Sequence, residues 1–213
     1  FESALVDEQA IPSIVKTPEY VAAGLEAQRK SIVLLNNKMV DVPVLPVRQG
    51  SKIFVDGLDP EQAKSFGTMV SSADQADVII LYLPSIFNGN QTPGSDELMD
   101  KLVSSILPDD NLAFNIAVLD KAKAYSETAT LITVVDLNRP AILTELDQIS
   151  DGLIGTFGVY ESILFEMIFG QFSPQGKLPF EIPSSMAAVM AQKEDLPDDS
   201  VAPIFKFGHG LSY

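Results

Sequence analysis

Three short runs of β-prone apolar residues limit the folds open to this chain more than any other feature of its sequence. They occupy residues 78–83, 131–136 and 153–157. A strand with one face in water alternates apolar and polar residues, whereas a strand buried on both faces is apolar almost throughout. The three runs therefore predict parallel strands in the interior of a sheet, as neighbours or near neighbours.

Candidate helices and shorter strands lie between and before these runs. Strand and helix alternate from about residue 52 to residue 170, and this order predicts a mostly parallel sheet with helices on both faces. The predicted fold is an α/β three-layer sandwich of the flavodoxin-like kind. The expected helices are residues 60–66, 113–126, 141–148 and 160–169, and the expected short strands are residues 52–55 and 68–70.

The N-terminal segment is predicted in two parts. Residues 1–17 show no clear period and are expected to be an irregular linker or arm. Thr17, Pro18 and Glu19 then start a helix, because threonine can cap it, proline suits its first turn and glutamate favours its positive end. Residues 32–35 either continue this helix or form a buried strand.

The rest of the chain is expected to form one domain, residues 18–213, since domains typically run to about 50–250 residues. Its tail after Gly170 is rich in proline and is predicted to be an ordered wrap with one strand at residues 178–182. The first residue is Phe rather than Met, so we expect the chain to come from a longer precursor.

Composition excludes several classes of partner and site. The formal net charge of −15 repels phosphate backbones and anionic lipids, so neither nucleic acid nor a membrane is an expected partner. The chain has no cysteine and a single histidine, His209, so no metal site is predicted. No Gly-rich phosphate loop follows a strand, and no cofactor is predicted. His209 lies between two glycines and is expected to be packed or hydrogen-bonded rather than catalytic.

Polar segments follow the predicted strands where open α/β sheets bind ligands. They are the loop from Pro84 to Asn111, the turn at residues 138–139 and residues 158–161. Amide and carboxyl side chains form hydrogen bonds with hydroxyl groups, so the loop is a candidate binding segment; the alternative is a solvated surface loop. Arg139 can hold a substrate oxygen or pair with one of the many acids. The candidate binding residues are Asn88, Asn90, Asp96 and Arg139.

Two segments of the tail carry a resemblance to a known family. They read GKLPFEIP at residues 176–183 and FKFGHGLSY at residues 205–213, and together they resemble the end of the C-terminal domain of glycoside hydrolase family 3. Four further segments agree with the family in the expected order. They are residues 27–37, 76–80, 138–143 and 169–176.

The resemblance implies a function that this chain does not perform alone. Members of the family are known mainly as β-glucosidases, β-xylosidases and related enzymes that hydrolyse O-glycosidic bonds. An N-terminal (β/α)₈ barrel of the same polypeptide supplies the aspartate nucleophile, and the second domain often supplies the acid/base carboxylate from the loop after the strand at residues 78–83. The resemblance thus implies a carbohydrate substrate, a barrel partner from which residues 1–17 would be the arm, and an isolated chain without activity.

One departure from the family leaves alternatives open. Many members have Gly-Glu soon after that strand, whereas this chain has Leu83, Pro84 and Ser85. A non-catalytic carbohydrate-binding or scaffolding domain that has lost its acid is therefore one alternative, and an unrelated flavodoxin-like binding domain is another. Glu97 is the candidate general acid, because it lies in the loop and reaches further than Asp96; both acids could instead begin a short helix.

Overall fold

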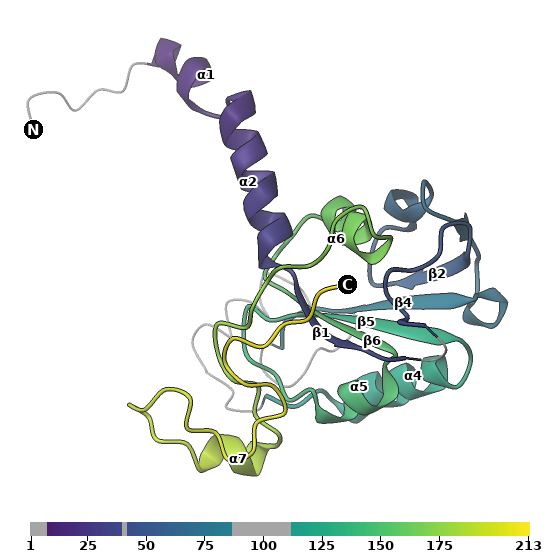
Figure 1. The fold of residues 1–213 in the computed structure, drawn as a ribbon, viewed down its shortest axis with the longest axis vertical. Coiled ribbons are helices and arrows are strands. Elements are labelled where there is room, and N and C mark those ends of the chain that lie inside the picture. The colour runs from purple at the N-terminus through teal and green to yellow at the C-terminus, as the bar shows by residue number, and fades with distance from the viewer. Residues whose placement is uncertain (1–7, 40–41, 87–111) are drawn as a thin grey trace, which may run out of the picture.

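The architecture is a six-stranded sheet between two layers of helices (Figure 1). The structure, a computed structural model, describes residues 8–39, 42–86 and 112–213. The strand order is β1-β6-β5-β4-β2-β3, and all neighbouring pairs are parallel except β1 with β6. The strands are β1 (Val33–Asn37), β2 (Lys52–Asp56), β3 (Thr68–Met69), β4 (Val78–Leu83), β5 (Thr130–Asp136) and β6 (Gly152–Thr156).

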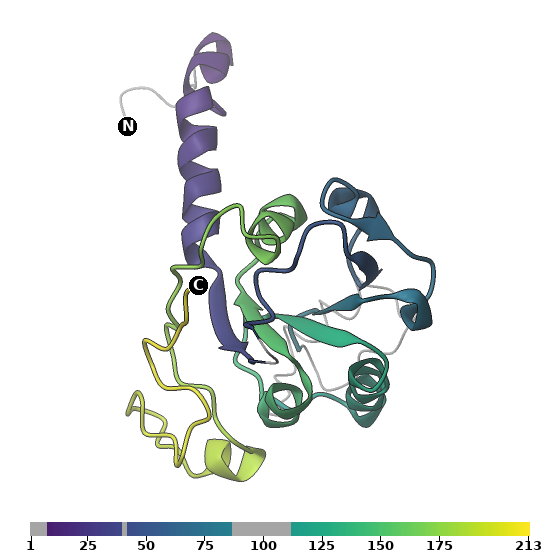
Figure 2. The same ribbon diagram turned by 45° about the vertical axis from the view of Figure 1, so that its right-hand side comes forward.

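The predicted fold class is confirmed, and the three apolar runs are the adjacent strands β4, β5 and β6. Helices α4 and α5 cover one face of the sheet, and α6 covers the other (Figure 2). None of the helices within the described residues is long and apolar enough to cross a membrane. The α-helices are α1 (Ile11–Ile14), α2 (Pro18–Ser31), α4 (Ile116–Ser126), α5 (Thr144–Ile149), α6 (Glu161–Ile168) and α7 (Met186–Met190), and the 3₁₀ helices are η1 (Glu8–Ala10), η2 (Pro60–Ala63) and η3 (Ala73–Gln75).

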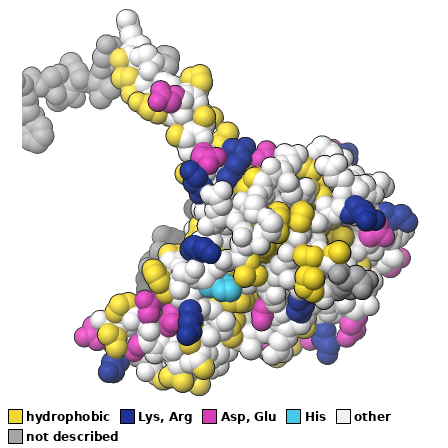
Figure 3. Space-filling view, viewed as in Figure 1, with side chains coloured by type: hydrophobic (Ala, Val, Ile, Leu, Met, Phe, Trp, Pro, Cys, Tyr) yellow, Lys and Arg dark blue, Asp and Glu magenta, His cyan; other side chains and the backbone are white. Residues whose placement is uncertain are grey.

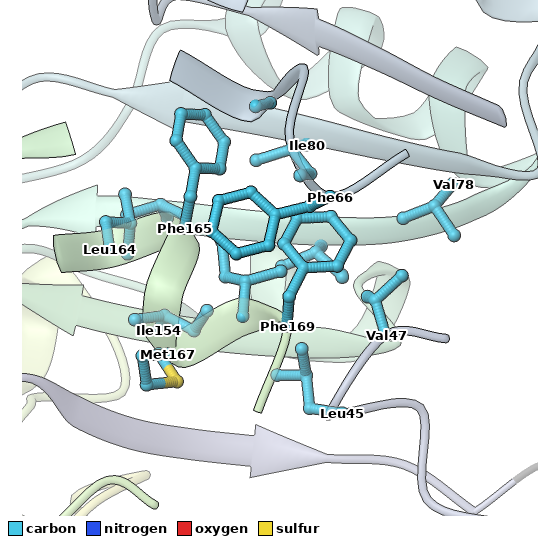
Figure 4. Close-up of a cluster of buried hydrophobic side chains, with 14 of the residues drawn as sticks. Leu45, Val47, Phe66, Val78, Ile80, Ile154, Leu164, Phe165, Met167 and Phe169 are labelled. Carbon is cyan, nitrogen blue, oxygen red and sulfur yellow. The ribbon is translucent and has the colours of Figure 1, made fainter. Parts of the chain in front are cut away.

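Alternation along each interior strand explains why those strands are apolar throughout. Ile80 in β4 points to the α6 side, where Phe66 and Phe169 stack with ring centroids 4.9 Å apart (Figure 4). Its neighbours Ile79 and Leu81 point to the side of α4 and α5. Because successive side chains enter opposite cores, a polar side chain on either face must find a partner inside the domain, as Thr133 of β5 does with Ser150 over 2.7 Å.

The predicted strand at residues 178–182 is wrong. Pro179 and Pro183 lack the amide hydrogens that a sheet ladder requires, and only an isolated bridge joins Ile182 to Phe205 in this part of the tail. The tail instead wraps over β1: the amide of Leu211 donates to the carbonyl of Leu34 over 2.8 Å, and the amide of Gly176 donates to that of Ile32 over 3.1 Å.

Gly176 shows why the tail motif needs a glycine at this point. A Cβ atom there would lie 2.9 Å from the carbonyl oxygen of Ser31 and closer still to the backbone of Ile32. Backbone atoms cannot yield as a flexible side chain can, so the close approach of tail and β1 depends on the missing side chain.

Of the two predictions for the N-terminal segment, one is confirmed and one is wrong in part. The helix from Pro18 is confirmed as α2, whose first turn is capped by the Thr17 hydroxyl, and β1 follows it as a buried strand. The prediction of an irregular arm is wrong for residues 8–14, which form η1 and α1. Pro12 near the start of α1 is compatible with a helix because the first helical amides have no partner within the helix.

Candidate functional site

The carboxyl ends of four parallel strands meet at one edge of the sheet. β2 ends at Asp56, β4 at Leu83, β5 at Asp136 and β6 at Thr156. In the pairing register Asp56 lies opposite Leu81, and Asp136 lies opposite Thr156. Asp56 and Asp136 therefore both lie at this edge, and their side chains lie on opposite faces of the sheet.

Asp136 organises the turn that carries Arg139. Its two carboxylate oxygens accept hydrogen bonds from the backbone amide of Asn138 over 2.9 Å and from the Asn138 side chain over 3.0 Å. This arrangement resembles a turn closed by an aspartate side chain, which fixes the backbone two residues on. The structure thus places Arg139, half-buried, at the predicted edge, and its role in binding stays a prediction.

A small cavity lies at the same edge on the α6 side. It has a volume of about 140 Å³ and is lined by Gly57, Tyr82, Thr156, Glu161 and three apolar residues. Ligand pockets typically measure about 300–1,000 Å³, so this cavity is too small to hold a sugar by itself.

Tyr82 is the polar group of this cavity that sequence reasoning missed. Burial raises its pKa to about 12, and the charge of Asp136 and a side-chain hydrogen bond with Asp136 act in the same direction. The shift disfavours the charged form of the hydroxyl group, which is a hydrogen-bond donor at neutral pH as in any tyrosine. The available signal was that Tyr82 is the only residue with a polar side-chain atom in the run 78–83.

A larger hollow of about 590 Å³ lies between the tail and the turn after β5. Its lining includes Pro140 from that turn, the rings of Phe180 and Phe207, and the carboxylates of Glu181 and Asp199. This volume lies within the range of ligand pockets. Aromatic rings offer apolar faces and carboxylates accept hydrogen bonds from hydroxyl groups, so the hollow has the chemistry of a carbohydrate contact surface.

Two carboxylates of the hollow are already partly engaged. Asp199 accepts a hydrogen bond from the backbone amide of Lys193 over 3.0 Å, and Glu181 accepts one from the amide of Ser200 over 3.1 Å. The other side-chain oxygen of Asp199 is buried and has no hydrogen-bond partner within the described part of the chain.

A third polar cluster lies on the face of the sheet that α4 covers, and its role is structural. The carboxylate of Asp56 accepts a hydrogen bond from the Tyr125 hydroxyl and forms an ion pair with Lys121, both over 2.9 Å. Burial and this hydrogen bond raise the pKa of Tyr125 to about 12. Both partners belong to α4, so the cluster fastens that helix to the end of β2.

The predicted residues Asn88, Asn90, Asp96 and Glu97 lie outside the described residues, and their roles stay predictions. The chain on either side of residues 87–111 is described. Ile86 follows β4 and is buried, and the carbonyl of Leu112 accepts a hydrogen bond from the amide of Ile142 over 2.8 Å, next to the turn after β5. Both ends of the predicted binding loop therefore lie at the carboxyl edge.

His209 is packed, as predicted. Its Nε2 atom lies 2.8 Å from the carbonyl oxygen of Leu35, and its ring stacks on Phe205 with centroids 4.7 Å apart. These contacts fasten the tail to β1 and give the histidine a structural role.

Comparison with known sequences gives a consistent result. A family model described as "Glycosyl hydrolase family 3 C-terminal domain" matches residues 61–213. The "Probable beta-glucosidase C" of Aspergillus flavus is 34% identical, and the "Periplasmic beta-glucosidase/beta-xylosidase" of Dickeya chrysanthemi is 32% identical. Both matches cover 100% of this chain but only 32% and 31% of those proteins. The chain thus spans about a third of the length of these curated relatives.

Solved structures agree on the fold. A crystal structure of a β-glucosidase from Listeria innocua superposes with a TM-score of 0.70 at 18% identity, covering 99% of this chain and 36% of that one. The β-D-glucoside glucohydrolase from Trichoderma reesei gives a TM-score of 0.66 at 17% identity, covering 92% of this chain and 37% of that one.

Proposed function

Because this chain belongs to glycoside hydrolase family 3, as a C-terminal domain of that family, we propose that it is the second domain of a β-glycosidase that hydrolyses O-glycosidic bonds. The family match over residues 61–213 carries the proposal, together with relatives that are beta-glucosidases by name and contain a match to the whole chain. The partner is a (β/α)₈ barrel in the same polypeptide, with residues 1–17 as the connecting arm and residues 18–213 as the second domain.

The carboxyl edge of the sheet is the surface that would close over the barrel's sugar site. Both described ends of the loop 84–111 lie there, and so does the turn that Asp136 holds in place. Arg139 would contact a sugar oxygen, and Asn88, Asn90 and Asp96 would contact hydroxyl groups. The 590 Å³ hollow beside Pro140 offers further aromatic and carboxylate contacts.

The proposed mechanism divides two carboxyl groups between two domains. Retaining hydrolysis requires a nucleophile and an acid only about 5–5.5 Å apart, on either side of the scissile bond. The barrel would supply the nucleophile, and Glu97 would protonate the leaving-group oxygen. Burial of Glu97 against the barrel would raise its carboxyl pKa and keep the proton in place near neutral pH.

One observation favours a non-catalytic alternative. Ser85 and Ile86 are only 3% and 5% exposed, so the chain shortly after β4 is packed into the domain, and it has no carboxyl side chain at residues 84–86. If the loop supplies no acid either, the domain would bind or position carbohydrate for the barrel without taking part in proton transfer.

The deciding experiment uses the full-length parent, with nitrophenyl β-glucoside and β-xyloside as substrates and a β-glucoside with a poor leaving group for the acid. We expect the parent to turn over substrate and the isolated chain to show none. Glu97→Gln should lower turnover of the poor-leaving-group substrate far more than Glu127→Gln, a matched change at the exposed C-terminal end of α4. Equal effects of the two changes would exclude Glu97 as the acid and leave the binding role.

A further inference from the structure

A projecting arm, defined as residues 11–27, carries apolar side chains away from the domain. Figures 1 and 2 both show α1 and α2 extending beyond the sheet and its helices. None of the 14 residues of α2, all of them described, is buried. Apolar side chains are visible along the arm in Figure 3. The large ones are Ile11, Ile14, Val15, Tyr20 and Val21, between 44% and 61% exposed.

Only the C-terminal part of α2 is fastened to the domain by the polar contacts within the described residues. Arg29 forms an ion pair with Glu166 of α6 over 3.1 Å. The side-chain oxygen of Gln28 accepts a hydrogen bond from the amide of Tyr160 over 2.8 Å. Leu25 packs at the margin of the core. The preceding turns of α2 extend past these anchors.

The exposed surface of α2 is divided into faces. Tyr20, Ala23, Gly24 and Ala27 follow the i, i+3, i+4, i+7 spacing of one helical stripe, and all four are exposed. A separate ridge carries Glu19, Glu26 and Lys30, with an ion pair of 3.2 Å between the last two.

An apolar stripe beside a charged ridge is typical of a helix that packs against another surface. Isolated helices shorter than about 12–15 residues are marginal in water, so a projecting helix gains little stability from its own backbone. The small side chains of Ala23, Gly24 and Ala27 also permit close packing, since the distance between packed elements depends on the side chains at their contact.

We infer that the stripe formed by Tyr20, Ala23, Gly24 and Ala27 docks on the preceding domain of the same polypeptide and sets the orientation of the two domains. This inference rests on the proposed function, which supplies that domain. The occupant is chosen on two grounds. The match covers only 32% of the Aspergillus flavus relative, so most of such a protein lies outside this chain. A second copy is disfavoured because each carries a net charge of −15, and like charges repel on approach.

The test measures cysteine accessibility in the full-length parent. Ala23→Cys lies in the stripe, and Ala22→Cys is the matched control on another face of the same helix; both alanines are exposed in this structure. Maleimide labelling is followed by mass spectrometry of the peptide that contains the new cysteine. We expect Cys at position 23 to react at least about tenfold more slowly than Cys at position 22, because packed atoms exclude the reagent. Rapid labelling of both positions at equal rates would overturn the inference.

Dilution distinguishes a second copy from the preceding domain as the occupant of the stripe. Protection that disappears on dilution would assign the stripe to a second copy and overturn the inference. Hydrolysis of nitrophenyl β-glucoside by the unmodified parent is measured in parallel. An inactive parent with protection at position 23 would contradict the proposed function and support the docking surface. An active parent without protection would support the proposed function and contradict the docking surface.

A charge placed in the stripe gives a second readout if labelling is slow for both variants. Ala23→Glu and Ala22→Glu make the same change in helix propensity, so a difference between them reports the surroundings of the two sites. We expect Ala23→Glu to lower the unfolding temperature of the parent by a few degrees and Ala22→Glu to leave it unchanged. Equal unfolding temperatures would overturn the inference.

Discussion

Tyr213 should lock the tail onto α6 through its hydroxyl group, and Tyr213→Phe tests this contact. The hydroxyl donates to the carbonyl oxygen of Met167 and lies 3.3 Å from that of Phe172. Phenylalanine keeps the ring but removes the donor. A hydrogen bond contributes about 0.5–1.5 kcal/mol net. The Met167 carbonyl keeps a hydrogen bond from the amide of Gly170 over 3.0 Å, so no penalty for an unpaired acceptor is added. We therefore expect a loss of about 0.5–1.5 kcal/mol in the free energy of unfolding at pH 7–8.

The loss should also depend on pH with a defined sign. Burial raises the pKa of Tyr213 to about 12, above its ordinary value of 10.0. A group whose pKa is higher in the folded state stabilises that state below the unfolded pKa, and this contribution disappears as the pH rises through the folded pKa. The difference between wild type and Tyr213→Phe should therefore be constant below pH 10 and shrink between pH 10 and about 12.

The assay is urea unfolding of the chain followed by far-UV circular dichroism, because the sequence has no tryptophan for fluorescence. Tyr160→Phe is the matched control. The Tyr160 side chain is 64% exposed, so the loss of its hydroxyl group leaves no buried group without a hydrogen bond. If Tyr213→Phe is as stable as this control at pH 7.5, the hydroxyl contacts contribute nothing and the reasoning fails.

Three further predictions concern the tail, α2 and the candidate site. Gly176→Ala should destabilise the chain by about 1–3 kcal/mol, because the added Cβ meets the backbone of Ser31 and Ile32. Gly24→Ala should stabilise the isolated chain by about 0.5–1 kcal/mol in the same urea assay, because alanine favours a helix and its Cβ would have no other atom within 4 Å. Asp136→Ala in the full-length parent should raise KM for nitrophenyl β-glucoside about 5-fold, equivalent to about 1 kcal/mol, because the turn that carries Arg139 loses two hydrogen bonds. An unchanged KM would remove Arg139 and its turn from the binding surface.

The interior of the fold could be predicted from the sequence because burial leaves a local record. Strands β4, β5 and β6 are apolar almost throughout on both of their faces, and only a strand covered on both faces tolerates this pattern. Thr17 and Pro18 marked the start of α2 by the same local logic, since capping involves only neighbouring residues. The tail motif GKLP reflects a tertiary constraint, but it was readable as a family resemblance.

The candidate site could be predicted only as an edge of the sheet. Strand ends are readable from the sequence, so the turn with Arg139 was placed correctly. The pairing of Asp136 with Tyr82 was not readable, because it depends on which strands are neighbours and on their register. No local pattern encodes the partner of a side chain more than 50 residues away.

Tertiary structure alone decided the direction of β1, the path of the tail and the exposure of the arm. β1 has the same apolar pattern as its parallel neighbours, yet it runs antiparallel to β6, because burial constrains the faces of a strand and leaves its direction open. The tail follows β1 because the amides of Gly176 and Leu211 donate to carbonyl oxygens of Ile32 and Leu34, and no local pattern in the tail encodes partners so distant in the sequence. The stripe of α2 has the spacing of a packed helical face, and only the structure shows that it is exposed and does not pack on this chain's own core.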